Sequence, residues 1–150
     1  MPQSLSNILV HIVFSTKNRQ DWITSDVENE LHRYIAAICN SLNCAAIQIG
    51  GTENHVHILC RLGRTITVSN LVRKIKTGSS KWIKTKGSPF FKFSWQNGYG
   101  IFSIGVSNLR ALKKYIINQK NHHRNKSFKD ELRKFLKEYQ IEYDERYVWD

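Results

Sequence analysis

The chain has 150 residues, of which 41% are hydrophobic, a composition typical of one globular domain with a buried core. Lys and Arg number 23 against 12 Asp and Glu, so the formal net charge is +11. Three cysteines without a Cys-x-x-Cys spacing argue against a disulfide scaffold and against a thiolate zinc site. We find no signal peptide and no apolar run of membrane-spanning length, and therefore expect a cytoplasmic protein without membrane contact.

The first predicted elements are a strand and a helix. Apolar residues alternate over residues 6–15, which predicts a strand with one apolar face. A helix then begins at Thr24 or Ser25 and runs to about residue 42. Glu28 stands three residues beyond Ser25, as a capping box requires.

Downstream of this helix the pattern predicts a hairpin and four further elements. Residues 45–49 and 55–61 are expected to be strands, and Gly50-Gly51 between them predicts the hairpin turn. The later elements are, in order, a helix that begins at Thr67 or Ser69, a strand over residues 99–106, a helix from Ser107 or Asn108 to about His123, and a helix from Phe128 to about Tyr139.

The order β-α-β-β-α-β is that of a ferredoxin-like, split βαβ fold. We therefore expect an α+β protein with an antiparallel sheet and helices on one face of it. A further helix that carries Tyr115 and a C-terminal helical extension would be added to this sheet. A single domain would span residues 1–150, with its core over 1–124 and the C-terminal helix and tail over 125–150.

His55 and His57 are the most informative residues of the chain. Side chains alternate along a strand with a period of two, so both imidazoles lie on one face, with Cβ atoms roughly 6–7 Å apart. At that separation both rings can reach one divalent ion. A lone His-x-His pair is nevertheless more often a detail of a polar strand face than a metal site. His11 is expected to be a satisfied core histidine or a wall of the site.

The helix that ends near residue 123 supplies the second half of a candidate site. Tyr115 and Gln119 are spaced i, i+4, so a phenol and an amide oxygen share one face and can lie against the histidine pair. Two imidazoles and one amide oxygen would hold a metal with open positions, as catalysis requires. A cation there would lower the pKa of the phenol and help it attack a phosphate, giving a phosphotyrosine. His122 and His123 are expected at a frayed, solvated helix end.

A long basic stretch indicates the partner. No Asp or Glu occurs between Asn54 and Lys129, and the stretch holds three aromatic residues that we expect to be exposed, Trp82, Trp95 and Tyr99. This combination favours nucleic acid over a merely solvated basic face. The residues that we expect to contact DNA lie in the second helix and its continuation, and in the turn after the first strand: Arg73, Lys74, Lys76, Lys81, Lys17 and Arg19.

Four motifs follow one another along the chain. They are Glu-Asn-His-Val-His at 53–57, Trp-Gln-Asn-Gly-Tyr-Gly at 95–100, Tyr115 with Gln119, and the tail Tyr-Asp-Glu-Arg-Tyr-Val-Trp at 143–149. In this order they resemble the motifs of the single-domain transposases of the IS200/IS605 type, within the HUH endonuclease superfamily. The resemblance extends over nearly the whole chain.

The resemblance implies a DNA transposase that acts as an HUH single-strand endonuclease, with Tyr115 as nucleophile and with His55, His57 and Gln119 as metal ligands. The metal would be Mg²⁺ or Mn²⁺, with good activity in Mn²⁺ because imidazole suits manganese. No nucleotide cofactor is expected. The substrate would be single-stranded DNA with hairpin-flanked ends, cleaved through a 5′-phosphotyrosine intermediate. The protein would be a homodimer in the cytoplasm of a bacterial or archaeal cell.

Three other functions stay open at this point. A domesticated relative would perform the same chemistry on hairpins of chromosomal repeats. A non-catalytic single-stranded nucleic-acid-binding module could use the same sheet, although RNA-recognition modules place aromatic residues where His55 and His57 stand. A phosphoesterase with two histidines as acid and base would need no tyrosine. Tyr115 could act in cis or in trans, and the acceptor of its proton is open.

Overall fold

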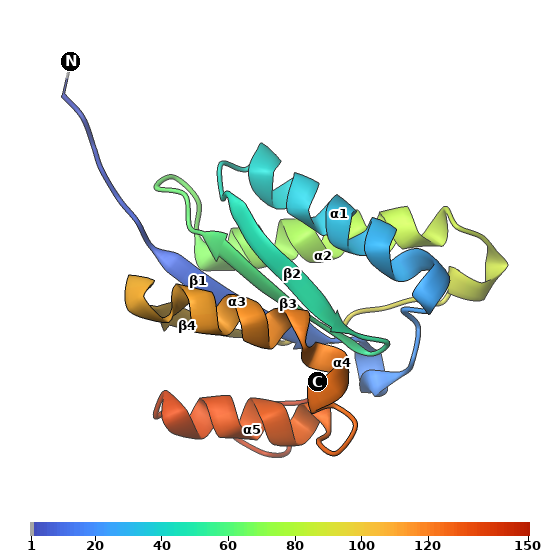
Figure 1. Ribbon diagram of the computed structural model, residues 1–150. Helices are drawn as coiled ribbons and strands as arrows, with labels where there is room; N and C mark the ends of the chain where they lie inside the picture. The colour runs from blue at the N-terminus through green and yellow to red at the C-terminus, as the bar shows by residue number, and fades with distance from the viewer. Residues whose placement is uncertain (1) are drawn as a thin grey trace.

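The computed structural model describes residues 2–150 and is built around one four-stranded antiparallel sheet (Figure 1). The strands are β1 (Leu9–Ser15), β2 (Ala46–Thr52), β3 (His55–Arg61) and β4 (Gly100–Ile104), and their order across the sheet is β2-β3-β1-β4. Helices α1 (Ser25–Ser41) and α2 (Val68–Lys84) each connect two of these strands. The predicted α+β, ferredoxin-like antiparallel sheet is confirmed.

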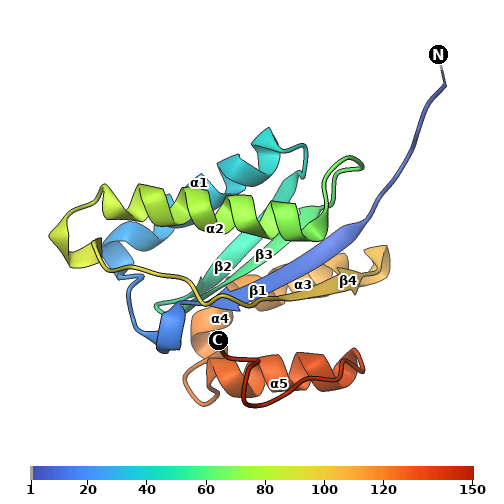
Figure 2. The same ribbon diagram turned by 180° about the vertical axis from the view of Figure 1, so that it is seen from behind.

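Helices lie on both faces of the sheet. Figures 1 and 2 show α1 and α2 side by side on one face, and the C-terminal helices toward the other. The C-terminal helices are α3 (Leu109–Ile117), α4 (Gln119–His122) and α5 (Phe128–Glu138), and the short 3-10 turns are η1 (Lys17–Arg19), η2 (Ser88–Phe90) and η3 (Val106–Asn108). No helix among residues 2–150 is long and apolar enough to span a membrane.

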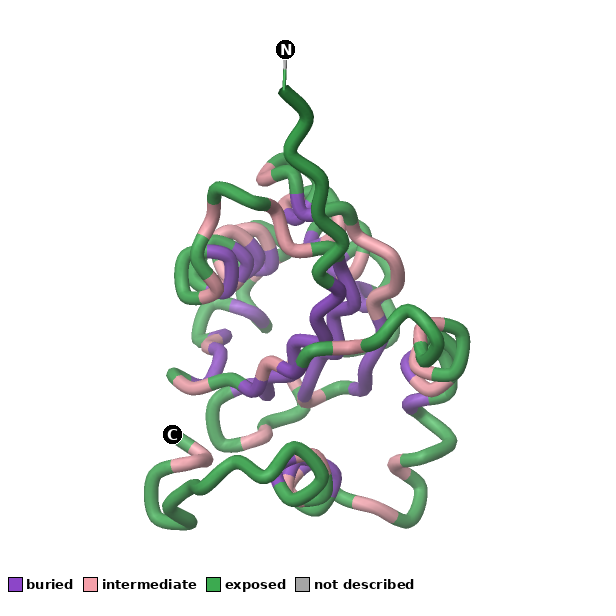
Figure 3. Tube along the Cα trace, turned by 90° about the vertical axis from the view of Figure 1, so that its left-hand side faces the viewer, coloured by how far each residue is buried: buried purple, intermediate pink, exposed green. Residues whose placement is uncertain are grey.

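The central strands bury both of their faces, and the alternation along each strand assigns its side chains to one of two cores. Ile12 and Phe14 of β1 pack into the main core between the sheet and α1 and α2. Val13 points the other way, into a smaller core with Phe128 and Leu132 of α5. Figure 3 shows the buried residues concentrated in the central strands and on the inner sides of the helices. Polar side chains on the second face are therefore enclosed by protein.

The Gly50-Gly51 pair does not form the hairpin turn, so that prediction is wrong. Both glycines lie within β2, and Glu53 and Asn54 form the turn. α3 crosses β2 so closely that a Cβ on Gly50 would lie 2.5 Å from the carbonyl oxygen of Ile116. Glycine at position 50 thus lets the helix that carries Tyr115 approach the sheet.

Helix α1 begins where predicted, but without the expected capping box. Thr24 is the N-cap residue, and its hydroxyl hydrogen-bonds the side chain of Asp26 instead of a backbone amide. The Glu28 carboxylate accepts from Lys120 Nζ at 2.6 Å and so links α1 to α4. The Ser25–Glu28 capping box is wrong because the N-cap is Thr24, which makes Ser25 the first helical residue, and because the Glu28 carboxylate pairs with Lys120 instead.

The helix predicted to end at about His123 is two helices. α3 ends at Ile117, Asn118 has φ −93° and ψ 20°, and α4 begins at Gln119. The strand predicted over 99–106 is shorter, because η3 begins at Val106. The break at Asn118 matters most, because it turns the chain between the two residues that we expect to act together.

Candidate active site

Strand β3 delivers two buried imidazoles to the sheet face that the C-terminal helices cover. His55 and His57 are fully buried, and their ring centroids are 5.2 Å apart. His55 Nδ1 lies 2.7 Å from Asn54 Oδ1 and 2.9 Å from Thr52 Oγ1. His57 Nδ1 lies 2.7 Å from His11 Nε2 on β1. With Nδ1 occupied, both Nε2 atoms face the same carboxylate, as in metal sites where a second hydrogen bond orients each ligand.

His11 forms a wall of this site, as expected, and stacks on His57 with ring centroids 4.9 Å apart. Burial, reinforced by neighbouring His57, lowers the pKa of His11 well below 6.5. Burial also lowers the pKa of His55 to about 3. Both rings are therefore neutral at pH 7. Neutral imidazole is the form that binds metals, and His11 Nε2 can accept the Nδ1 proton of His57.

Helices α3 and α4 bring Tyr115 and Gln119 to the histidine pair. Gln119 is buried, and its Oε1 lies 3.0 Å from His55 Nε2. Tyr115 is half-buried, and its ring centroid lies 6.0 Å from that of His57. Although the break at Asn118 means that the two residues do not share one helix, both side chains reach the site. The structure thus brings together the four residues that the sequence singled out for chemistry.

Glu131 of α5, which we did not predict, has its carboxylate at the centre of the cluster. The residue is 1% exposed. Its Oε1 is 2.9 Å from His57 Nε2 and 3.6 Å from His55 Nε2. Its Oε2 accepts hydrogen bonds from Gln119 Nε2, at 3.1 Å, and from the Tyr115 hydroxyl. One carboxylate therefore contacts the imidazoles on one side and the phenol on the other.

The sequence contains a signal that could have identified Glu131. Phe128, Leu132 and Phe135 stand at i, i+4 and i+7 and form the apolar stripe of α5, and Glu131 lies within that stripe. An acidic residue on the buried face of an amphipathic helix needs polar partners in the interior.

His123 was expected to be solvated, and this prediction is wrong. Its side chain is 10% exposed, and its Nε2 lies 3.1 Å from Glu131 Oε1. Its ring centroid is 4.4 Å from that of His55. The turn after α4 folds His123 back, where its Nδ1 hydrogen-bonds the Lys126 carbonyl.

The charges of the site follow from burial and from these contacts. Burial of Glu131 favours its protonated form, but the neighbouring rings of His123 and His57 lower its pKa well below the usual range. Burial, reinforced by the Glu131 charge, raises the pKa of Tyr115 above its ordinary value. The phenol therefore stays protonated and donates to the carboxylate. Without added positive charge it is a weak nucleophile.

The donor set fits one divalent metal ion. His55, His57, His123 and Glu131 each offer one ligand atom, and these atoms all lie within 4.8 Å of one another. Gln119 Oε1 adds an oxygen beside His55. Ligands at right angles, each about 2.1 Å from an ion, lie about 3 Å apart. Imidazole nitrogens and carboxylate or amide oxygens are ordinary ligands of such ions.

A cavity of about 410 Å³ adjoins this cluster, and His123 lies in its wall. Among the described residues that line it, Glu53 is the only acidic one. Its basic lining residues come from η1, from α4 and from the segment between α4 and the first turn of α5: Arg19, Lys120, Arg124, Lys126 and Lys129. Arg19 also donates to the Trp149 carbonyl, 2.9 Å away. Lys17, the other predicted residue of this turn, is exposed.

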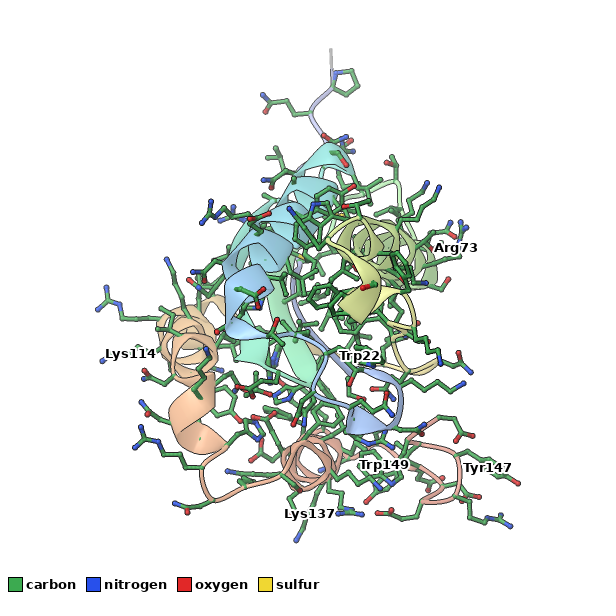
Figure 4. The ribbon with its side chains drawn as sticks, turned by 90° about the vertical axis from the view of Figure 1, so that its right-hand side faces the viewer. Trp22, Arg73, Lys114, Lys137, Tyr147 and Trp149 are labelled. Atoms are coloured by element: carbon green, nitrogen blue, oxygen red, sulfur yellow. The ribbon has the colours of Figure 1, made fainter. Side chains whose placement is uncertain are left out.

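The basic residues predicted on the second helix differ in their placement. Arg73, Lys74 and Lys81 are exposed on α2, and Figure 4 shows Arg73 pointing outward. Lys76 turns inward instead. Its Nζ donates to three backbone carbonyls, those of Gln96, Asn97 and Gly98, at 2.7, 3.1 and 2.7 Å. Lys76 therefore holds the loop before β4 in place, and we predicted a DNA contact for it instead.

The aromatic residues near α2 are less exposed than expected. Trp95 is 6% exposed, and its indole nitrogen donates to Ser79 Oγ at 3.0 Å, so its predicted exposure is wrong. Trp82 is half-buried and stacks on Tyr34. Tyr99 is 39% exposed. Of the three aromatic residues that we expected to be exposed, only Tyr99 is exposed.

Comparisons with known proteins show what the chain resembles. A family model described as "Transposase IS200 like" matches residues 4–119. A comparison with curated proteins finds no match. A solved candidate transposase from Deinococcus radiodurans R1 is 16% identical, with a TM-score of 0.62 over 79% of this chain and 98% of that chain.

A second solved structure is a REP-associated tyrosine transposase bound to a REP hairpin. It is 17% identical, with a TM-score of 0.60 over 82% of this chain and 73% of that chain. At such identities the two structures establish the shared fold. The family match covers most of the chain and includes His55, His57, Tyr115 and Gln119. The chain therefore belongs to the family of IS200-like transposases.

Proposed function

We propose that this transposase cleaves and rejoins single-stranded DNA through a covalent bond between Tyr115 and a 5′-phosphate. The observation that carries the proposal is the meeting of the Tyr115 hydroxyl with the imidazoles of His55 and His57 around one buried carboxylate. A binding module has no need of a phenol beside such a cluster. A phosphoesterase that uses two histidines has no need of the tyrosine.

In the cleavage step the Tyr115 oxygen bonds to the scissile phosphorus, and the bond from phosphorus to the 3′ oxygen breaks. The phenol proton is released, and the 3′ oxygen takes up a proton to become a free 3′-OH. One phosphodiester bond is exchanged for another, so the reverse step rejoins DNA without ATP. The hydrogen bond to Glu131 holds the hydroxyl in position before attack.

The proposed metal is Mg²⁺ or Mn²⁺, held by Nε2 of His55, Nε2 of His57 and Oε1 of Gln119. Such an ion polarises phosphate oxygens and lowers the pKa of a nearby phenol. Two imidazole ligands favour Mn²⁺ over Mg²⁺. The contact between His57 Nδ1 and His11 Nε2 would orient the His57 ring so that its Nε2 faces the ion.

The proposed substrate is single-stranded DNA that carries hairpins. The basic cavity beside His123 and the exposed face of α2 offer two surfaces for phosphates. A structural neighbour is bound to a REP hairpin, which supports hairpin DNA as the ligand here. The same neighbour favours a second candidate role, on dispersed chromosomal hairpins instead of the ends of a mobile element.

The resemblance implied a homodimer, and we retain this as a proposal that the chemistry does not require. Tyr115 and the metal-type donors come from the same chain, and α3 packs closely on β2 through Gly50 and Ile116. We therefore propose that Tyr115 acts in cis.

Replacing Tyr115 with Phe should abolish the covalent adduct, because the attacking oxygen is removed. Purified protein would be mixed with single-stranded oligonucleotides from the flanks of its gene in Mn²⁺ and run on a denaturing gel. We expect adduct formation to fall by about 10³-fold or more, while Tyr99→Phe forms the adduct normally. An adduct that persists in Tyr115→Phe would place the nucleophile elsewhere.

Replacing His11 with Phe should weaken Mn²⁺ binding by about 10- to 100-fold, since it removes the partner that orients His57 while keeping a ring in the same space. His11→Asn, which keeps a hydrogen-bond acceptor, should recover part of the affinity. Calorimetric titration with Mn²⁺ measures both values. Unchanged affinity in His11→Phe would mean that His57 does not depend on His11 for its orientation.

Replacing Arg73, Lys74 and Lys81 together with Ala should weaken hairpin binding and flatten its salt dependence. The slope should fall by roughly one unit for each of these side chains that binds a phosphate. Fluorescence anisotropy with a labelled hairpin at several salt concentrations measures the slope. Lys137→Ala, an exposed residue of α5 at the bottom of the view in Figure 4, where Arg73 is at the upper right, is the control and should change little. Intact affinity and slope in the triple variant would exclude α2 as a DNA-binding surface.

A further inference from the structure

Two residues of the cluster, His123 and Glu131, lie beyond residue 119, where the family match ends. We propose that Glu131 is an additional ligand of the metal through Oε1, and that its Oε2 positions the Tyr115 hydroxyl. Helix α5 would thereby couple metal binding to the placement of the nucleophile. This inference rests on the proposed function and adds to it a ligand from the C-terminal helix.

The distances from Glu131 are those of neighbouring ligands around one ion. Its Oε1 lies 2.9 Å from His57 Nε2, 3.1 Å from His123 Nε2 and 3.6 Å from His55 Nε2. Ligands about 2.1 Å from a common ion lie about 3.0 Å apart at right angles and about 3.4 Å apart at tetrahedral angles. The Glu131 oxygen therefore already stands where a ligand would stand.

The charge of the cluster indicates that a cation belongs there. Glu131 is 1% exposed, and within residues 2–150 all its ion-pair partners are imidazoles, with no Lys or Arg among them. A buried carboxylate is costly unless a positive charge lies beside it. A divalent ion among His55, His57 and Glu131 supplies that charge and leaves the imidazoles neutral.

The packing of α5 explains how Glu131 is held in place. Ser127 caps the helix by accepting from the Asp130 amide, and Phe128, Leu132 and Leu136 anchor it in the second core. These contacts fix the backbone on both sides of position 131. The carboxylate is thus presented to the sheet by a capped and packed helix, the kind of support that a metal ligand requires.

The two oxygens of Glu131 have separate partners. Oε1 faces the imidazoles, whereas Oε2 accepts from the Tyr115 hydroxyl and from Gln119 Nε2. An ion on Oε1 leaves the Oε2 hydrogen bonds in place. Movement of α5 away from the sheet would remove a ligand and release Tyr115 together.

Mn²⁺ titration of the full-length protein tests this proposal. Glu131→Gln keeps the shape and a hydrogen-bonding group but removes the charge, and should weaken Mn²⁺ affinity by about tenfold or more. Glu138→Gln, an exposed acid of the same helix, is the matched control and should bind Mn²⁺ as the wild type does. If Glu131→Gln does not fold, Glu131→Asp replaces it, because it keeps the charge but withdraws it by one methylene. Weaker binding is expected for that variant too.

Hydrogen exchange gives a second readout that does not depend on activity. Mn²⁺ should slow exchange of the α5 backbone amides in the wild type and in Glu138→Gln, but not in Glu131→Gln. Equal or tighter Mn²⁺ binding by both Glu131 variants would overturn the proposal. If these variants also formed the adduct faster than the wild type, Glu131 would be a residue that blocks the active site. If the wild type forms no adduct but Glu131→Gln still loses Mn²⁺ affinity, the ligand assignment stands and the proposed function fails.

Discussion

The constraint on which the site depends is that β3 is buried on both faces while carrying two imidazoles on one of them. Val56 and Ile58 of this strand enter the main core, so His55 and His57 must point to the opposite side of the sheet. Buried imidazole nitrogens need polar partners, because unsatisfied polar groups in the interior are costly. The second face of the sheet therefore cannot be closed by apolar residues alone.

The layer that closes this face supplies those partners and assembles the site in doing so. His11 hydrogen-bonds Nδ1 of His57, and Asn54 hydrogen-bonds Nδ1 of His55. The two Nε2 atoms contact Gln119 and Glu131 of the C-terminal helices. Packing and chemistry are thus served by the same contacts. The tyrosine helix can lie this close to the sheet because residue 50 has no side chain. Its phenol comes within reach of the carboxylate from α5.

The sheet and the first half of the site could be predicted from the sequence because they depend on local periodicity. β3 has the predicted bounds, and the alternation of β1 correctly separates His11 from Ile12 and Phe14. The Gly50-Gly51 turn failed because glycine also serves close helix packing, which depends on a residue 66 positions away. Local pattern cannot distinguish these two uses of glycine.

The rest of the site was missed because its residues come together only in three dimensions. The break at Asn118 and the turn after α4 place His123 inward, and neither is marked by a glycine or a proline. Glu131 belongs to a helix that by itself resembles an ordinary amphipathic surface helix. An acid within its apolar stripe indicates a buried carboxylate, but the partners of that carboxylate are imidazoles that lie far away along the chain.

We propose that one metal ion joins the histidine pair to the helices that carry Tyr115 and Glu131. Crystals grown in Mn²⁺ would locate the ion by its anomalous scattering. We expect a single peak about 2.1 Å from four ligand atoms: Nε2 of His55, Nε2 of His57, Oε1 of Gln119 and Oε1 of Glu131. A peak elsewhere on the molecule, or one bound by the histidines without either helical ligand, would contradict this proposal.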